Sequence, residues 1–301
     1  MVIFIANPTA GAGKAGAAIP IVEKKMQSLG INHAIINTGG PGDIEKVAAK
    51  VEQATEGAAP SAIVCVGGDG TVQEYAGLAL KYGSPYGVIP CGTANDLLYS
   101  LPGTGMRFNS FEEKINFYAS KLSDMPVTSI DAVSINGSCY FLNIGGTGMD
   151  INVLIDALPL KKYFSGGAYF ISMIKNAVTY KDEEMTLTID GKAESGTYLL
   201  LAICNGAYYG GHLKVAPPAV PNDGLLTMCV IKKMPRIKRV AVFPLVKPGL
   251  HSKLKEVSYI NCESVILEYE GIKTINLDGN LQEFESPLKF EVMKGAIKFI
   301  N

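Results

Sequence analysis

An apolar run that ends in a glycine-rich turn constrains the fold of this chain more than any other feature. Ala62–Val66 is apolar and rich in β-branched residues, and the tract Gly67–Thr71, with the letters GGDGT, follows at once. Glycine lets backbone amides approach a phosphate closely. Thr71 and Glu74 have capping-box spacing, which predicts a helix that starts there with its positive end towards the turn. Asp69 adds a carboxylate that suits Mg²⁺, so the tract predicts a nucleotide-phosphate site. The simpler alternative is a tight turn before an ordinary helix cap.

The first 125 residues alternate apolar runs with helical patterns, as parallel βαβ units do. The predicted strands are Val2–Ala6, His33–Asn37, Ala62–Val66 and Tyr86–Ile89, and the predicted helices are Ala17–Leu29, Ile44–Gln53, Val72–Tyr82 and Phe111–Leu122. Short connections and nearly continuous apolar strands indicate a parallel sheet that is covered on both faces. We therefore predict a three-layer α/β nucleotide domain over residues 1–126.

The pattern changes after Met125. Ser129–Ile135, the pair Asn136-Gly137 and Ser138–Ile144 predict a hairpin, because Asn-Gly suits the positive φ angles of a type I′ turn. Further strands are predicted over Met185–Ile189, Thr197–Ile203, Leu225–Ile231, Val265–Tyr269, Thr274–Leu277 and Leu288–Val292, and one helix is predicted over Tyr163–Tyr180. We predict an antiparallel β-sandwich domain over residues 127–301. The fold class is therefore α/β followed by all-β.

Two more loops that follow N-terminal strands suit a phosphate site. The first runs from Asn7 to Lys14 and is not a Walker A loop, because alanine follows Gly13-Lys14 where serine or threonine is required. Its glycines match the dinucleotide fingerprint only weakly. The second, Pro90–Asp96, repeats the spacing of a helix cap. Loops at the carboxyl ends of parallel strands share one crevice, so we expect Asp69 and Asp96 to meet there and share a metal ion. The alternative is that each caps a helix.

Together these motifs resemble the nucleotide-site motifs of the diacylglycerol kinase catalytic family, and the whole chain resembles the soluble bacterial lipid kinases of that family. The matching segments are Asn7-Pro8 with Gly11, Gly67–Thr71, Gly92–Asp96, Gly210–Pro217, Pro221–Leu226 and Leu277–Gly279. The resemblance implies a nucleotide domain and a β-sandwich domain with the active site between them. It also implies an ATP-dependent kinase that phosphorylates a lipid hydroxyl, such as that of diacylglycerol.

The resemblance assigns roles to residues by position. ATP would be held by Asn7, Pro8, Thr9, Ala10, Gly11, Thr38, Gly67, Gly68, Asp69, Gly70, Thr71, Val72, Gln73 and Thr93. The catalytic carboxylates would be Asp69, Asp96 and Asp131, which organise Mg²⁺, and Asp278, the general base near the acceptor hydroxyl. A structural metal would be held by the Asp223 side chain and the carbonyls of Val220 and Leu225. Without the resemblance, Asp278-Gly279 is more typical of an ordinary hairpin turn.

The chain departs from the family in its late motif. The usual D-G-E reads Asp278-Gly279-Asn280 here, and an amide is not a base near neutral pH. If the glutamate is the residue that accepts the proton in the family, the turnover rate of this chain should be low. If Asp278 accepts it, the turnover rate should be little changed. Two other functions stay open: a nucleotide-binding protein with little or no kinase activity, and an enzyme like the NAD kinases, which share the G-G-D-G core. The Gly92–Asp96 and Gly210–Pro217 segments argue against the NAD kinase.

Positive charge is concentrated in one segment. Residues 232–255 contain eight basic residues and no acidic residue, although the formal net charge of the chain is −1. Apolar residues are interleaved with them, and such a surface can dock on anionic headgroups. We therefore predict peripheral association with an anionic membrane. The alternatives are basic residues paired with acidic residues elsewhere in the fold, or a patch that steers ATP.

Several function classes are not expected. No apolar run is long enough to span a membrane, and the first residues lack the features of a signal peptide. The six cysteines are scattered without C-x-x-C spacing, which favours reduced thiols in a cytoplasm. We predict a cytoplasmic protein at the inner face of the membrane, with ATP and Mg²⁺ as cofactors. Its expected partners are a lipid substrate and the membrane surface, not nucleic acid, and a homodimer is left open.

Overall fold

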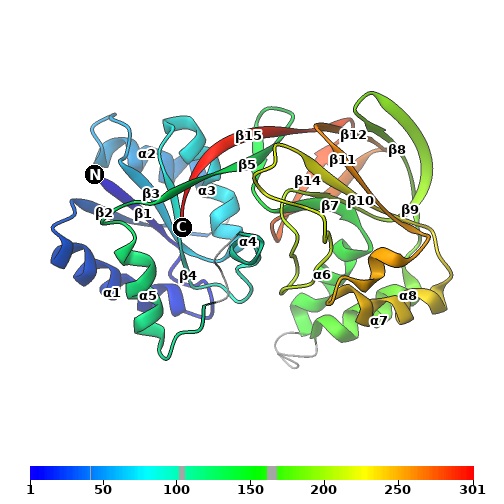
Figure 1. Cartoon of the computed structure of the whole chain (residues 1–301), viewed down its shortest axis with the longest axis horizontal. Coiled ribbons are helices and arrows are strands. Elements are labelled where there is room, and N and C mark those ends of the chain that lie inside the picture. Colours follow the sequence, from blue (N-terminus) through cyan, green and yellow to red (C-terminus); the bar gives the residue numbers. More distant parts are fainter. Residues whose placement is uncertain (41, 102–105, 161–167) are drawn as a thin grey trace.

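The computed structural model describes residues 1–40, 42–101, 106–160 and 168–301, and the chain forms two lobes that lie side by side (Figure 1). Two long strands, β5 (Val127–Ile135) and β15 (Leu288–Ile300), run from one lobe to the other. The N-terminal lobe holds helices on both faces of a sheet. The C-terminal lobe is made mainly of strands, with helices along its lower edge in this view.

The N-terminal sheet is parallel and has the strand order β4-β3-β1-β2. Its strands are β1 (Val2–Ala6), β2 (His33–Asn37), β3 (Ala62–Gly67) and β4 (Tyr86–Pro90). They match the predicted strands to within one residue. Long apolar runs form these strands because both faces of the sheet are buried.

Alternating side chains of this sheet contact two helix layers. Val2 and Phe4 pack with α1 (Lys14–Leu29) and α5 (Phe111–Ser120) on one face. Ile3 and Ile5 pack with α2 (Ile44–Ala54) and α3 (Asp69–Tyr82) on the other face. A short helix, α4 (Asp96–Ser100), follows β4. The predicted three-layer α/β lobe is therefore confirmed.

Two predicted helix caps are wrong. Helix α3 begins at Asp69, and the Glu74 carboxylate accepts the amide of Gly42 at 2.7 Å instead of joining Thr71 in a capping box. Asp96 is itself the first residue of α4, and its carboxylate accepts amides from residues 211 and 212. In both cases the carboxylate has a partner that is distant in sequence, which a local spacing cannot reveal.

The C-terminal strands are antiparallel and enclose a core that includes Phe141, Tyr198 and Phe290. Their bounds are β6 Cys139–Phe141, β7 Ile144–Gly148, β8 Glu183–Ile189, β9 Lys192–Cys204, β10 Leu226–Lys232, β11 Val257–Cys262, β12 Ser264–Glu268, β13 Ile272–Leu277 and β14 Asn280–Glu285. The predicted hairpin is confirmed, because β5 pairs with β6 around a turn in which Asn136 and Gly137 have φ angles of 49° and 71°. The predicted β-sandwich architecture of this lobe is confirmed as well.

Helices in the C-terminal lobe are more numerous than predicted. The predicted helix contains α7 (Ala168–Thr179), while its residues 163–167 lie outside the described residues. The sequence did not predict α6 (Met149–Leu160) or α8 (Arg236–Val246). A 3₁₀ turn, η1 (Leu250–Lys253), follows α8. In the described part of the chain, no helix combines the length and the apolar character needed to cross a membrane.

Strand β15 joins the two lobes into one hydrogen-bonded sheet. Its first part pairs with β12 in the C-terminal lobe. Its end returns to the N-terminal lobe, where Phe299 pairs in parallel with Tyr86 of β4. Ile297 and Phe299 are buried in the N-terminal core. The loops at the carboxyl ends of the parallel strands are therefore held at a defined place beside the C-terminal lobe.

Candidate functional site

The three predicted nucleotide loops pack against one another at the carboxyl ends of the parallel strands. A Cβ atom on Gly11 would lie 1.8 Å from the carbonyl oxygen of Cys91. A Cβ atom on Gly92 would lie 2.5 Å from the Cα atom of Gly68. Only glycine permits backbone contacts this close, so these glycines bring the three loops together.

The residues assigned to ATP lie along this one edge of the sheet. Asn7 to Gly11 follow β1, Thr38 follows β2, Gly67 to Gln73 join β3 to α3, and Thr93 follows β4. The Asn7 side chain accepts hydrogen bonds from the amide and the hydroxyl of Thr9, at 3.2 and 2.8 Å, and closes the first loop. The first turn of α3 faces this edge, and the free amides of a helix N-terminus attract phosphate.

Asp69 opens α3 at the centre of this edge. Its carboxylate accepts the amide of Leu97 at 3.3 Å. Burial and, to a smaller extent, the negative charge of Asp96 raise the pKa of Asp69 to about 6. A buried carboxylate whose ionisation is disfavoured by a neighbouring negative charge is a place where a divalent cation is favourable.

Asp96 links the two lobes. Its carboxylate is 6% exposed and accepts the amides of Gly211 and His212 at 3.0 and 2.7 Å. The His212 ring stacks on Tyr99 with ring centroids 3.5 Å apart, and its Nε2 lies 2.9 Å from the carbonyl oxygen of Ala94. The glycine-rich segment of the C-terminal lobe is therefore bound directly to the third nucleotide loop.

Asp278 lies in the turn between β13 and β14 and is 7% exposed. Its carboxylate accepts the amides of Leu142 at 2.9 Å, Asn143 at 3.1 and 3.2 Å, and Ile144 at 2.7 Å. Burial raises the pKa of Asp278 to about 7, the negative charge of Asp69 adds to this rise, and the amide hydrogen bonds oppose it. The structure thus brings Asp69, Asp96 and Asp278 together at the junction of the lobes.

Asp131 has different partners. It is 2% exposed, and its carboxylate accepts the amides of Gly224 and Gly295 at 2.8 and 2.6 Å. These partners belong to the loop before β10 and to the bend of β15, not to the nucleotide loops. The carboxylate therefore holds the C-terminal lobe together in this structure.

Metal binding at the junction would rely on few protein ligands. Among residues 1–40, 42–101, 106–160 and 168–301, no three His, Cys, Asp or Glu side chains are grouped to hold a metal ion. Mg²⁺ is commonly held by one or two carboxylates, with water and phosphate oxygens as the other ligands. Asp69 beside the phosphate-binding turn fits that mode of binding.

The residues that were predicted to bind a structural metal lie in the loop before β10. Asp223 is exposed, and its carboxylate accepts the amide of Leu225 at 2.9 Å. Val220 is 45% exposed in the same loop. One carboxylate and two carbonyl groups would be the protein ligands, and this metal site stays a prediction.

A cavity of about 540 Å³ adjoins the third nucleotide loop. Thr93, Lys14 and Lys114 line it. Burial lowers the pKa of the Lys114 ammonium, and the positive charge of Lys14 lowers it further. No ion pair to either lysine is formed within the described residues, so a phosphate group would be favourable here. Lys114 was missed because it lies on α5, far in sequence from every motif.

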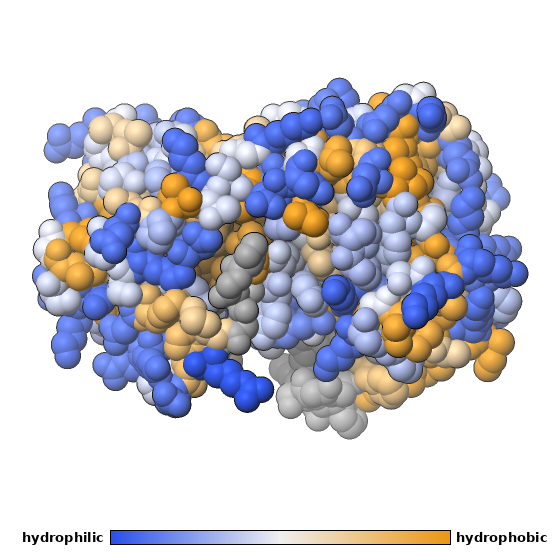
Figure 2. Space-filling view, viewed as in Figure 1, coloured by the Kyte–Doolittle hydropathy of each residue, from blue (hydrophilic) through white to orange (hydrophobic). Residues whose placement is uncertain are grey.

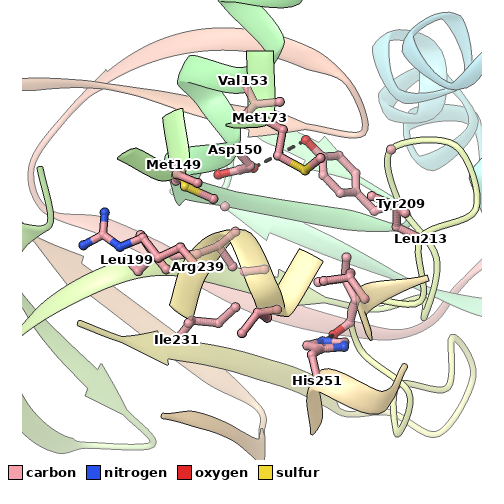
Figure 3. Close-up of a pocket in the computed structure, with 18 of the residues that line it drawn as sticks. Met149, Asp150, Val153, Met173, Leu199, Tyr209, Leu213, Ile231, Arg239 and His251 are labelled. Atoms are coloured by element: carbon pink, nitrogen blue, oxygen red, sulfur yellow. Dashed lines mark hydrogen bonds between the residues drawn. The ribbon is translucent and has the colours of Figure 1, made fainter. Parts of the chain in front are cut away.

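A second cavity, of about 500 Å³, lies in the C-terminal lobe between the helices α6, α7 and α8 and the strands that face them (Figure 3). Apolar side chains from these helices and from β9 and β10 form its walls, among them Met149, Met173, Leu199 and Ile231. We call it the apolar pocket. Arg239 also lines it, but its guanidinium is bonded to the Asp182 carboxylate and to two carbonyl oxygens. The sequence could not reveal the apolar pocket, because α6 and α8 were not predicted.

One end of the apolar pocket is polar. The Tyr209 hydroxyl donates to the Asp150 carboxylate at 3.4 Å and accepts a hydrogen bond from the Asn276 side chain. Burial raises the pKa of Asp150 to about 6, and its Oδ1 has no hydrogen-bond partner among the described residues. Asp150 was not among the predicted site residues.

This polar end adjoins the aspartates that were predicted to be catalytic. Ile144 lines the apolar pocket and donates its amide to Asp278. Asn276 lines it too, and its side chain accepts the amide of Gly279 at 2.9 Å. The apolar pocket therefore ends next to the carboxylates at the junction of the lobes.

Comparisons with known proteins agree with this architecture. Residues 1–134 match the diacylglycerol kinase catalytic domain, and residues 145–301 match the YegS C-terminal NAD kinase beta sandwich-like domain. A diacylglycerol kinase of Mycobacterium tuberculosis (strain CDC 1551 / Oshkosh) is 28% identical over 97% of this chain and 91% of its own. A diacylglycerol kinase of Bacillus subtilis (strain 168) is 28% identical over 92% of this chain and 88% of its own. The crystal structure of a diacylglycerol kinase from Bacillus anthracis str. Sterne superposes with a TM-score of 0.76 at 25% identity, covering 99% of this chain and 96% of that chain.

Replacement of Asp131 by alanine tests whether its role is structural. We expect the free energy of unfolding to fall by about 3 kcal/mol, because the amides of Gly224 and Gly295 lose their buried acceptor. Mg²⁺-ATP affinity of the folded variant should be unchanged. Urea denaturation and calorimetric ATP titration measure the two effects, with the exposed Asp124→Ala as control. Wild-type stability combined with weaker Mg²⁺-ATP binding would instead assign Asp131 to the metal.

Proposed function

The chain belongs to the family that joins a diacylglycerol kinase catalytic domain to a YegS C-terminal NAD kinase beta sandwich-like domain, and from this we propose that it is an ATP-dependent lipid kinase. It would transfer the γ-phosphoryl group of ATP to a lipid hydroxyl, such as that of diacylglycerol. One observation carries the proposal: the apolar pocket ends beside Asp278, which itself neighbours Asp69. A place for a lipid and a place for phosphates therefore meet at one junction.

The N-terminal loops would bind the nucleotide. Backbone amides of the GGDGT turn and of the first turn of α3 would contact its phosphates. Asp69 would hold Mg²⁺, which neutralises the charge that develops during phosphoryl transfer. Lys14 and Lys114 would add positive charge beside Thr93. Phosphoryl transfer needs mainly positioning and charge neutralisation, and these groups supply both.

Asp278 would accept the proton of the lipid hydroxyl. Three amides make four contacts with the two oxygens of this carboxylate, because the Asn143 amide is shared between them, so the substrate hydroxyl would take over one of the two positions that Asn143 shares. A pKa of about 7 leaves the group substantially ionised at neutral pH and basic enough to take a proton. In this role the missing glutamate at position 280 does not abolish catalysis.

The apolar pocket would hold acyl chains. Its volume of about 500 Å³ lies within the range of small-molecule sites, and most of the side chains in its walls are aliphatic or thioether groups. The Asp150 carboxylate, which lines the pocket, would face the polar part of the lipid. A dinucleotide offers no comparable apolar portion, which argues against the NAD kinase alternative.

We further propose that the surface around α7 and α8 contacts the membrane. Phe170 and Ile174 of α7 line the apolar pocket and are 56% and 40% exposed, so the pocket reaches the surface here. Ile237 of α8 is 82% exposed. Figure 2 shows apolar side chains gathered along this edge of the C-terminal lobe. A lipid could pass from a bilayer into the apolar pocket at this surface.

The basic segment 232–255 contributes to this surface only in part. Lys232, Lys238 and Arg239 form ion pairs with Glu194, Glu256 and Asp182, respectively. For these three residues, the alternative of basic residues paired within the fold takes the place of the predicted membrane contact. The other basic residues, Lys233, Arg236, Lys247, Lys253 and Lys255, are exposed. They would attract anionic headgroups, each by about 1 kcal/mol. A homodimer stays a prediction.

The activity itself is tested with labelled ATP, Mg²⁺ and a panel of lipids and NAD. We expect label on a lipid that carries a free hydroxyl, and Asp69→Asn should reduce transfer more than 100-fold when Mg²⁺ is limiting. The pKa of Asp69 is raised to about 6 in the folded chain, so its ionised form destabilises the fold at pH 8. Asp69→Asn carries no charge, and its Tm at pH 8 should therefore be no lower than that of wild type. Label on NAD, or no label on any lipid, would contradict the proposal. Undiminished transfer by Asp69→Asn would exclude the metal role.

Filling the apolar pocket tests the site of the acyl chains. Ala177 lines the pocket and is 2% exposed, whereas its neighbour Val178 is 46% exposed. We expect Ala177→Phe to raise KM for a long-chain substrate at least tenfold and to affect a short-chain substrate less, because the ring occupies space used by the distal chain. Val178→Phe, on the outer face, is the matched control. Equal effects of Ala177→Phe on both chain lengths would contradict the assignment.

Membrane docking is tested by co-sedimentation with anionic and neutral vesicles over a range of salt concentrations. Lys233→Glu/Arg236→Glu should weaken binding to anionic vesicles at least tenfold, since two attractive charges become repulsive. Lys46→Glu/Lys50→Glu, on α2 of the N-terminal lobe, changes the net charge equally and should have little effect. Binding that ignores lipid charge, salt and both double variants would refute the docking surface.

A further inference from the structure

Asn280 forms a polar bridge between the lobes. It is the first residue of β14, and its side-chain amide donates to the carbonyl oxygen of Gly70 at 3.0 Å and to the Gln73 side chain at 2.7 Å. Both partners lie on the first turns of α3. Gln73 is 4% exposed and donates onward to the carbonyl oxygen of Tyr140 in β6 at 2.7 Å. One chain of amides therefore connects β14, α3 and β6.

The bridge joins the immediate neighbours of two catalytic candidates. Asn280 lies two residues after Asp278, and Gly70 directly follows Asp69. Any change in the length of the bridge would thus alter the separation of these two aspartates. The contact is close, because a Cβ atom on Gly70 would lie 2.7 Å from the Asn280 side-chain oxygen. A side chain at position 70 would therefore displace the Asn280 side chain, so glycine here leaves room for the bridge.

Only a hydrogen-bond donor can make this bridge. Its two acceptors are a backbone carbonyl oxygen and the Gln73 side-chain oxygen, and the asparagine amide offers two hydrogens to them. An ionised carboxylate only accepts hydrogen bonds. The glutamate that the family usually carries at this position would face two oxygen atoms here and repel them.

We propose that Asn280 is a positioning residue that fixes the start of α3 against the Asp278 turn. It thereby sets the distance between the phosphate-binding loop and the lipid hydroxyl, a role that rests on the proposed kinase function. Asparagine at position 280 is then an adaptation of this chain and not the loss of a catalytic group. A displacement of about 1 Å in such a site can reduce turnover about 100-fold, so a bridge of this kind affects rate without contacting substrate.

The test combines hydrogen exchange with kinetics on four variants of the full chain. Asn280→Glu and Asn280→Asp remove the donor and add charge, Asn280→Gln keeps the amide, and Gln282→Glu adds the same charge at an exposed position on β14. We expect both acidic variants at position 280 to speed amide exchange in residues 69–73 at least tenfold and to lower kcat at least tenfold. Asn280→Gln keeps both donor hydrogens but is one methylene longer, so it should recover only part of both losses, and Gln282→Glu should match wild type.

Each other outcome decides against the proposal. Higher turnover of Asn280→Glu would mean that position 280 needs a carboxylate. Unchanged exchange in the acidic variants would show that the bridge does not hold α3, and faster exchange with unchanged kcat would show that it does not position the reaction. If the wild-type chain transfers no phosphoryl group to any lipid, the proposed function fails separately. The exchange rates and the Kd for Mg²⁺-ATP then decide whether Asn280 orders the phosphate-binding turn.

Discussion

Three consecutive backbone amides that hold one buried carboxylate form the interaction on which the rest of this structure depends. The amides of Leu142, Asn143 and Ile144 converge on Asp278, which is 7% exposed. They run from the end of β6 to the first residue of β7, so the same hydrogen bonds set where the hairpin ends and where β7 begins to line the apolar pocket. The carboxylate remains next to Asp69, although burial and that neighbouring charge both disfavour its ionisation.

Interactions of two kinds keep the lobes in register around this carboxylate. The first is backbone pairing, since β15 leaves the C-terminal sheet and ends beside β4. The second is a set of polar contacts across the junction, in which Asp96 binds the amides of Gly211 and His212, and Asn280 binds the start of α3. Phosphoryl transfer depends on accurate placement of two reactants, and a junction held in this way is suited to it.

The sequence predicted the elements that local physics determines. The parallel strands were placed to within one residue, because both of their faces are buried and they are apolar throughout. Clustering of the glycine loops followed from the topology of parallel sheets. Long-range partners were not predictable: Glu74 bonds to Gly42 instead of capping α3, and Asp131 bonds to the loop before β10. The apolar pocket was missed because neither α6 nor α8, which form part of its wall, was predicted from the sequence.

Proton transfer to Asp278 is tested most directly by the pH dependence of kcat/KM for phosphoryl transfer to the lipid, because kcat/KM reports the ionisation of the free enzyme. The group must be ionised to act as a base, and its folded pKa is raised to about 7. The value of kcat/KM should therefore rise about tenfold per pH unit below pH 7 and level off above it. Asp278→Asn should lose this rise together with most of the activity while still binding Mg²⁺-ATP. A wild-type kcat/KM that stays constant from about pH 5 to pH 8, or a pH profile that Asp278→Asn preserves, would contradict a catalytic role for this carboxylate.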